Sequence, residues 1–172
     1  MPVYLFTFHA YRSWNADNPR GFVRSTARLL PPDTEMADHY DQNASEEPVL
    51  FDRRSQQILI WAFSDACQRR EWRLHGIATE PTHVHLMVSW KGDAGWSHVR
   101  DRLKNVASLL LGRKLSRPGR RWFSRKGSRK RVEDQTHYDH LMRNYLPKHS
   151  GLCWQEGDSP PEEPPPIVDP EK

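Results

Sequence analysis

The sequence predicts an α+β fold, in which helices cover a central antiparallel sheet. Two strand-like runs lie close enough together to form a hairpin, which favours antiparallel pairing. Helical segments stand between the other strands, but few of them are placed to serve as crossovers between parallel strands. The 172 residues and 36% hydrophobic content suffice for one compact core. We expect that domain at residues 1–154.

The first half of the chain supplies a strand, a loop and a helix. Residues Val3–Tyr11 are aromatic and β-branched, which is typical of a strand. Residues 31–48 are polar and acidic without useful periodicity, and we expect a long surface loop there. Asp52 is placed to cap a helix that runs to about Arg70. That helix should be well buried, because its middle is apolar nearly all round.

The hairpin and two further helices follow. Residues 72–78 and 83–90 are two strand-like runs joined by the turn residues 79–82. Ser97 is then placed to cap a helix, and a last helix starts near Asp134. Their apolar residues recur with helical spacing, at Val99, Leu103, Val106 and Leu110 in the first and at Tyr138, Leu141, Met142 and Tyr145 in the second. Between these helices, residues 121–132 predict a basic hairpin or bent strand.

Charge is distributed unevenly along the chain. Residues 100–131 hold 13 of the 26 lysines and arginines, with Asp101 as the one acid among them. Such a concentration favours a polyanionic partner, and we expect nucleic acid. Residues 155–172 are rich in proline and acid and are expected to be disordered. The candidate DNA-binding residues are Arg100, Lys104, Arg113, Lys114, Arg120, Arg121, Arg125, Lys126, Arg129, Lys130 and Arg131.

His83 and His85 are the candidate metal ligands. Alternate residues of a strand point to one face, so the two imidazoles project together while Val84 is buried behind them. Two imidazoles at this spacing form half of a metal site. With nine histidines in the chain, the pattern alone is also compatible with coincidence.

Several motifs in order resemble the single-tyrosine HUH transposases, including the repeat-associated (RAYT-type) tyrosine transposases. The strand Glu80–Val88 resembles the His-hydrophobic-His strand of that family. Phe6–Tyr11 with Pro19–Gly21 is similar to its opening strand and loop, and Trp72–Gly76 to the strand that precedes the histidines. Arg121–Arg129 resembles its late basic strand, and Leu141–Tyr145 with Gly151 resembles its tyrosine helix. The resemblance covers most of residues 3–154.

The resemblance implies an HUH-endonuclease fold, a ferredoxin- or RRM-like sandwich, and a mechanism. Members bind a divalent ion through two histidines and a third polar side chain. A tyrosine cleaves single-stranded or hairpin DNA through a 5′-phosphotyrosine intermediate, which conserves the phosphodiester energy for strand transfer. Tyr145 matches the nucleophile, and Tyr138 is the alternative from the sequence. On periodicity alone, Tyr145 would simply complete the apolar stripe of its helix.

The third ligand departs from the family pattern. A glutamine or asparagine commonly stands four residues after the tyrosine, where this sequence has His149. Three imidazoles suit manganese or zinc better than magnesium, which prefers oxygen. Pro147 lies between Tyr145 and His149 and is able to stop or kink the helix. His149 is then either a ligand or a loop histidine beside a helix end.

Two alternatives stay open. One is a domesticated DNA-binding protein that has kept the fold and lost cleavage, and the other is a zinc hydrolase with a three-histidine site. The chain lacks an apolar run of membrane-spanning length, and its two cysteines form no framework, so we expect a cytoplasmic, nucleoid-associated protein. Both a monomer and a homodimer are compatible with the sequence.

Overall fold

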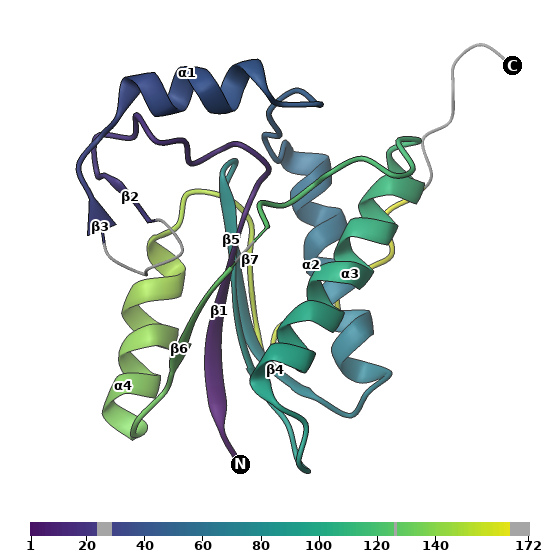
Figure 1. The fold of residues 1–172 in the computed structure, drawn as a ribbon. Coiled ribbons are helices and arrows are strands. Elements are labelled where there is room, and N and C mark those ends of the chain that lie inside the picture. Colours follow the sequence, from purple (N-terminus) through teal and green to yellow (C-terminus); the bar gives the residue numbers. More distant parts are fainter. Residues whose placement is uncertain (24–28, 126, 166–172) are drawn as a thin grey trace, which may run out of the picture.

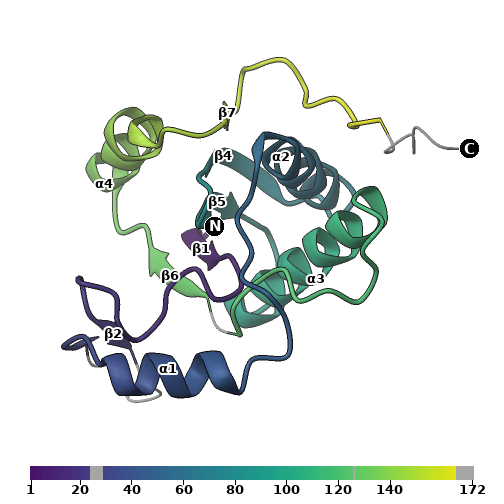
Figure 2. The ribbon, with the colours of Figure 1, turned by 90° about the horizontal axis from the view of Figure 1, so that it is seen from above.

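The computed structural model describes residues 1–23, 29–125 and 127–165, which form three layers with a sheet in the middle (Figure 1). Helices α2 (Arg53–Gln68) and α3 (Trp96–Lys114) cover one face of the sheet. Helix α4 (Gln135–His140) lies on the other face. Figure 2, viewed from above, shows these two helix layers on opposite sides of the strands. The predicted α+β fold is therefore confirmed.

The central sheet has five strands in the order β6-β1-β5-β4-β7, and every neighbouring pair is antiparallel. The strands are β1 (Val3–His9), β4 (Arg73–Thr79), β5 (His83–Ser89), β6 (Ser128–Arg131) and β7 (Cys153–Gln155). Strands β4 and β5 form the expected hairpin. The basic segment forms no hairpin within its described part, because β6 pairs with β1 as an edge strand.

The larger core lies between the sheet and the pair α2 and α3. Asp52 caps α2 as expected, since its carboxylate accepts a hydrogen bond from Ser55 N at 2.7 Å. Helix α3 begins after Gly95, and the expected cap by Ser97 is wrong. Its buried residues recur every four positions, at Val99, Leu103, Ala107 and Leu111, so the expected Val106 and Leu110 lie at the border of the interface. None of the described helices combines the length and apolarity needed to cross a membrane.

The smaller core lies under α4 and positions the candidate site. Leu5 of β1 and Met87 of β5 pack here against Leu141 and Leu146. After α4 the chain widens into a π-helix, Leu141–Tyr145, and then tightens into a 3-10 helix, Leu146–Lys148. The regular helix expected through Tyr145 therefore changes its pitch at Leu141.

The expected surface loop at residues 31–48 contains a helix, which corrects that prediction. Helix α1 (Thr34–Gln42) is capped by Asp33, whose carboxylate accepts a hydrogen bond from Met36 N at 2.9 Å. Its Ala37 packs with Ala16 and Phe22 beside the small two-stranded sheet of β2 (Phe22–Val23) and β3 (Leu29–Leu30). The helix buries only this narrow stripe, and most of its other residues are exposed.

The chain after β7 runs along the outside of α2 towards α3 (Figure 2). Glu156 pairs with Arg73 at 2.9 Å, and Glu163 pairs with Lys114 at 2.5 Å. The part of the tail up to residue 165 thus contacts the domain, whereas residues 166–172 lie outside the described residues. The expected boundary at residue 154 stays a prediction.

Candidate metal centre

Strand β5 places His83 and His85 on the face that α4 covers. Val84, between them, is fully buried in the larger core on the opposite face. The ring centroids of His83 and His85 lie 4.7 Å apart. The alternation expected from the sequence therefore brings the two imidazoles together.

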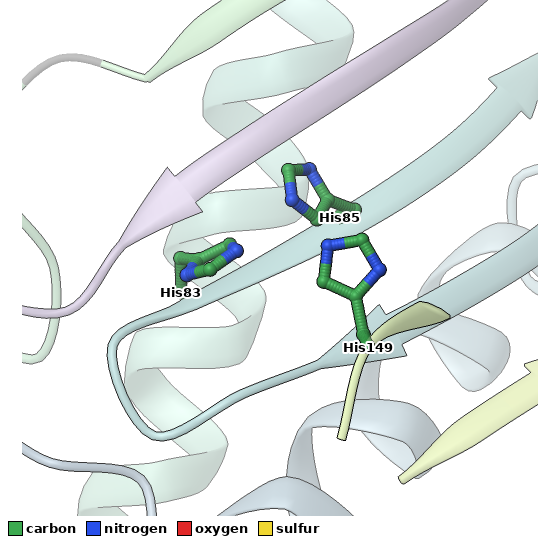
Figure 3. Close-up of side chains that lie close together, drawn as sticks. All are labelled: His83, His85 and His149. Carbon is green, nitrogen blue, oxygen red and sulfur yellow. The ribbon is translucent and has the colours of Figure 1, made fainter. Parts of the chain in front are cut away.

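His149 completes a cluster with these two histidines, as Figure 3 shows. Its ring centroid lies 4.6 Å from that of His85 and 5.7 Å from that of His83. One ring nitrogen of each of the three residues lies within 4.8 Å of the others. Two nitrogens bound to one zinc ion lie about 3–4 Å apart, so small movements of these rings suffice to bring them onto one ion.

Pro147 does not remove His149 from the site. The proline lies in the first turn of the 3-10 helix, where a missing N–H breaks no helical hydrogen bond. The wide π turn followed by the tight 3-10 turn brings the extended residue His149 back beside Tyr145. Their ring centroids lie 5.2 Å apart. The imidazole of His149 therefore faces His83 and His85, and its role as a metal ligand stays a prediction.

Each imidazole of the cluster is held through its Nδ1 atom. His85 Nδ1 lies 2.8 Å from the hydroxyl of Thr7, and His83 Nδ1 lies 2.9 Å from that of Thr82. His149 Nδ1 lies 3.1 Å from the carbonyl oxygen of Leu146. A carbonyl only accepts, so His149 carries its proton on Nδ1 and leaves the lone pair on Nε2. A hydrogen bond to the other ring nitrogen orients a histidine for metal binding in this way.

Burial keeps the imidazoles of His83 and His85 neutral, which is the form that binds a metal. The pKa of His85 is lowered to about 3, chiefly by burial and further by His83, His149 and His9. Burial also lowers the pKa of His83, and the charge of Glu80 partly opposes this. His9 lies beside His83, with ring centroids 5.7 Å apart, and among the described residues its buried Nδ1 has no hydrogen-bond partner. The donor set therefore fits a divalent ion.

Tyr145 reaches this cluster, whereas Tyr138 does not. The hydroxyl of Tyr145 lies 3.3 Å from His85 Nε2. That of Tyr138 lies 3.0 Å from Nδ1 of His75, a buried residue that also contacts Ser89 at 2.8 Å. Of the two tyrosines considered from the sequence, only Tyr145 lies beside the candidate ligands.

The candidate DNA-binding residues do not all lie near the cluster. Those of α3 occupy the helix layer opposite α4 (Figures 1 and 2). Arg100 and Arg129 both lie against the ring of Trp96, at 5.1 and 3.8 Å. Lys130 pairs with Leu5 and so shares the face of the cluster, and Lys126 lies outside the described residues. The edge strand β6 therefore joins the basic residues of α3 to the face of the three histidines.

Most of the remaining basic candidates contact other parts of the protein surface, and one of them contacts the tail. Lys104 donates to the carbonyls of Ser124 and Arg125, and Lys114 pairs with Glu163. Arg120 lies over the buried Trp122, and Arg121 pairs with Glu46. Trp122 and Trp90 are core residues and are too buried to stack a base. Arg113, Arg125 and Arg131 are exposed.

Thr7 also contributes to the candidate metal centre, and the sequence did not single it out. It is buried on the same face of β1 as Leu5, and it pairs across the ladder with His85. The signal was present in the first strand, because a polar residue there alternates with Phe6 and Phe8. Its hydroxyl holds the Nδ1 side of His85 and thereby directs Nε2 towards Tyr145.

No family model matches the sequence, and no curated protein matches it either. The structure is similar to that of a REP-associated tyrosine transposase bound to a REP hairpin, at 14% identity and a TM-score of 0.47, over 82% of this chain and 62% of that chain. It is also similar to a candidate transposase from Deinococcus radiodurans R1, at 10% identity and a TM-score of 0.40, over 88% of this chain and 94% of that chain. The chain thus spans 62% of the length of the first of these proteins.

Proposed function

We propose that this protein is a metal-dependent HUH-type tyrosine transposase, which cleaves and rejoins single-stranded DNA through Tyr145. The observation that carries the proposal is the contact of 3.3 Å between the Tyr145 hydroxyl and Nε2 of His85, inside a cluster of three histidines. A nucleophile beside a metal site is the arrangement that phosphoryl transfer by a tyrosine requires. The order of the motifs in the sequence supports the same activity. A protein with this activity would work where the DNA of the cell is.

His83, His85 and His149 are the residues that would hold the ion. A divalent ion bound there would polarise the scissile phosphate and stabilise the charge on its oxygens. The chain contributes the rest by orientation: Thr7, Thr82 and the carbonyl of Leu146 hold the three rings by their Nδ1 atoms. The basic edge strand β6 lies on the path by which a DNA backbone reaches this face.

Tyr145 supplies the covalent step. Its Oη atom attacks the phosphorus and forms the phosphotyrosine bond, while the bond from phosphorus to the 3′ oxygen breaks. The tyrosine loses its proton and the departing strand gains one, so a free 3′-OH results. Attack by this hydroxyl on the phosphotyrosine reverses the step and rejoins DNA without ATP.

The surroundings of Tyr145 explain why the proposed reaction needs a cation. Burial raises the pKa of Tyr145, and the charge of Glu80 raises it further. The protein alone therefore disfavours the phenolate, which is the nucleophilic form. Positive charge beside the Tyr145 oxygen favours the phenolate and so lowers the pKa again.

A covalent adduct tests the proposal. Purified protein with Mn²⁺ and a labelled single-stranded hairpin DNA is expected to give a protein–DNA adduct that survives denaturing electrophoresis. Tyr145→Phe is expected to abolish the adduct and to leave DNA binding unchanged, because it removes only the hydroxyl. Tyr138→Phe is the matched control on the same helical segment, and its adduct should remain.

The same assay separates the alternatives. DNA binding by the wild type without any adduct would favour the domesticated binding protein. An adduct that is lost in Tyr138→Phe and kept in Tyr145→Phe would show that Tyr138, and not Tyr145, is the nucleophile. Indifference to DNA, with hydrolysis of other substrates in the presence of zinc, would favour the three-histidine hydrolase.

The ion preference is a second prediction. Three imidazoles are expected to bind Mn²⁺ or Zn²⁺ more tightly than Mg²⁺, because magnesium prefers oxygen ligands. Isothermal titration of the metal-free protein with each ion measures this directly. His149→Gln should reduce the difference in affinity between Mn²⁺ or Zn²⁺ and Mg²⁺, since an amide oxygen replaces one nitrogen ligand. Equal or tighter binding of Mg²⁺ by the wild type would contradict the prediction.

A further inference from the structure

The segment that follows His149 is fixed to the sheet by a set of buried polar groups. Thr79 ends β4 and is fully buried, and Gln56 of α2 is 6% exposed. Neither residue contacts the candidate ligands, so the proposed function gives them no role. Buried polar side chains are costly unless hydrogen-bonded, which makes their partners informative.

Gln56 uses both ends of its amide. Its Nε2 atom donates to Phe51 O at 2.9 Å, which fixes the side chain at the start of α2. Its Oε1 atom lies 3.0 Å from the hydroxyl of Thr79 and accepts from Leu152 N, also at 3.0 Å. The amide therefore links α2, the end of β4 and the segment after His149.

Thr79 binds the same segment from the strand side. Its backbone N donates to Leu152 O at 2.9 Å, and its hydroxyl lies 2.7 Å from the same carbonyl. Two residues before Leu152, Ser150 N donates to Glu80 Oε1 at 3.2 Å. Residues 150 and 152 are thus held at the end of β4, so the backbone of His149 has little freedom to move away.

We propose that Gln56 and Thr79 are positioning residues, which clamp Leu152 so that the imidazole of His149 stays beside His83 and His85. The proposal rests on the proposed function only for the use of that imidazole as a metal ligand. Because the helix ends at Lys148, no helical hydrogen bond fixes His149 from the C-terminal side. The clamp replaces that restraint from a different part of the fold.

Gln56→Leu is the first test, because it keeps the approximate size and removes both hydrogen-bonding ends. Its affinity for Mn²⁺ or Zn²⁺, measured by titration, is expected to fall about 10-fold to 100-fold, the range for loss of outer-shell support. Gln57→Leu is the matched control, since Gln57 is the exposed neighbour on the same helix. Its metal affinity should equal that of the wild type.

A pair of variants at Thr79 decides the matter if Gln56→Leu fails to fold. Thr79→Ser keeps the hydroxyl and should retain metal affinity, whereas Thr79→Val keeps the shape, loses the hydroxyl and should reproduce the loss. Circular dichroism confirms that both are folded. Equal metal affinity of Thr79→Val, Thr79→Ser and the wild type would overturn the proposal.

A chemical readout tests the clamp without any metal. Diethyl pyrocarbonate modifies accessible imidazoles, and peptide mapping follows His149 separately from the exposed His140. Modification of His149 should become several-fold faster in Gln56→Leu or Thr79→Val, while His140 should not change. If the wild type binds no metal, the proposed function fails, and an unchanged rate at His149 would still overturn the clamp on its own.

Discussion

Replacing Gly151 by alanine is expected to displace the segment that carries His149. A Cβ atom at this position would lie 2.0 Å from Thr79 O and 2.6 Å from Gln56 Oε1. The first is a backbone atom of β4, which has no room to retreat, so the segment itself must move. We expect a loss of about 1–3 kcal/mol in the free energy of unfolding, as for other overpacked sites. The affinity for Mn²⁺ or Zn²⁺ should fall at least about 10-fold.

Gly95→Ala is the control for the Gly151 experiment. Gly95 precedes α3, and among the described residues an added Cβ would meet only the side chain of Ser97, whose Oγ atom would lie 3.9 Å away. This variant should keep both stability and metal affinity near those of the wild type. Urea unfolding and metal titration measure the two quantities. A Gly151→Ala protein that matched Gly95→Ala in both would show that the segment adapts without cost.

The sequence was sufficient to predict the part of the site that lies on regular strands. Side chains alternate along β5, so His83 and His85 had to share a face whatever covered it. Tyr145 was also predicted from its motif. His149 was named as a candidate ligand, but the sequence left its position open, because that position depends on a change from π to 3-10 pitch around Pro147. Such changes follow from packing against Met87 and Leu5, which local periodicity does not reveal.

The two faces of the sheet explain why the sequence did not predict which basic residues lie near the site. A count of charges along residues 100–131 predicts a basic region but does not say which side of the sheet it covers. The structure places α3 opposite α4, and among the described residues strand β6 joins that region to the face of the site. The burial of Gln56 could have been predicted from the sequence, because Gln56 lies with Leu59, Ile60 and Phe63 on the buried stripe of α2. A polar residue on such a stripe indicates a buried hydrogen-bonded partner.

Acid is expected to destabilise the metal-free protein through its buried histidines. Burial lowers the pKa of His9, His75 and His83 from 6.5, and that of His85 to about 3. The unfolded chain exposes these rings and takes up protons below pH 6.5, whereas the folded chain resists this. The unfolded state therefore binds more protons, and stability falls as the pH is lowered through 6.5 towards about 3. For His85, whose folded pKa is about 3, the contribution is about 1.4 kcal/mol per pH unit within this range.

His85→Leu isolates one of these contributions. Urea unfolding of the chelator-treated protein at a series of pH values should show a slope smaller by about 1.4 kcal/mol per pH unit than that of the wild type. His98→Leu, at an exposed position of α3, should keep the wild-type slope. Bound metal requires the same neutral rings, so added Zn²⁺ should stabilise the wild type most near neutral pH and least in acid. Identical slopes for His85→Leu and the wild type would mean that His85 takes up a proton in the folded chain as readily as in the unfolded chain, and a protonated Nε2 is closed to a metal and to the proton of Tyr145.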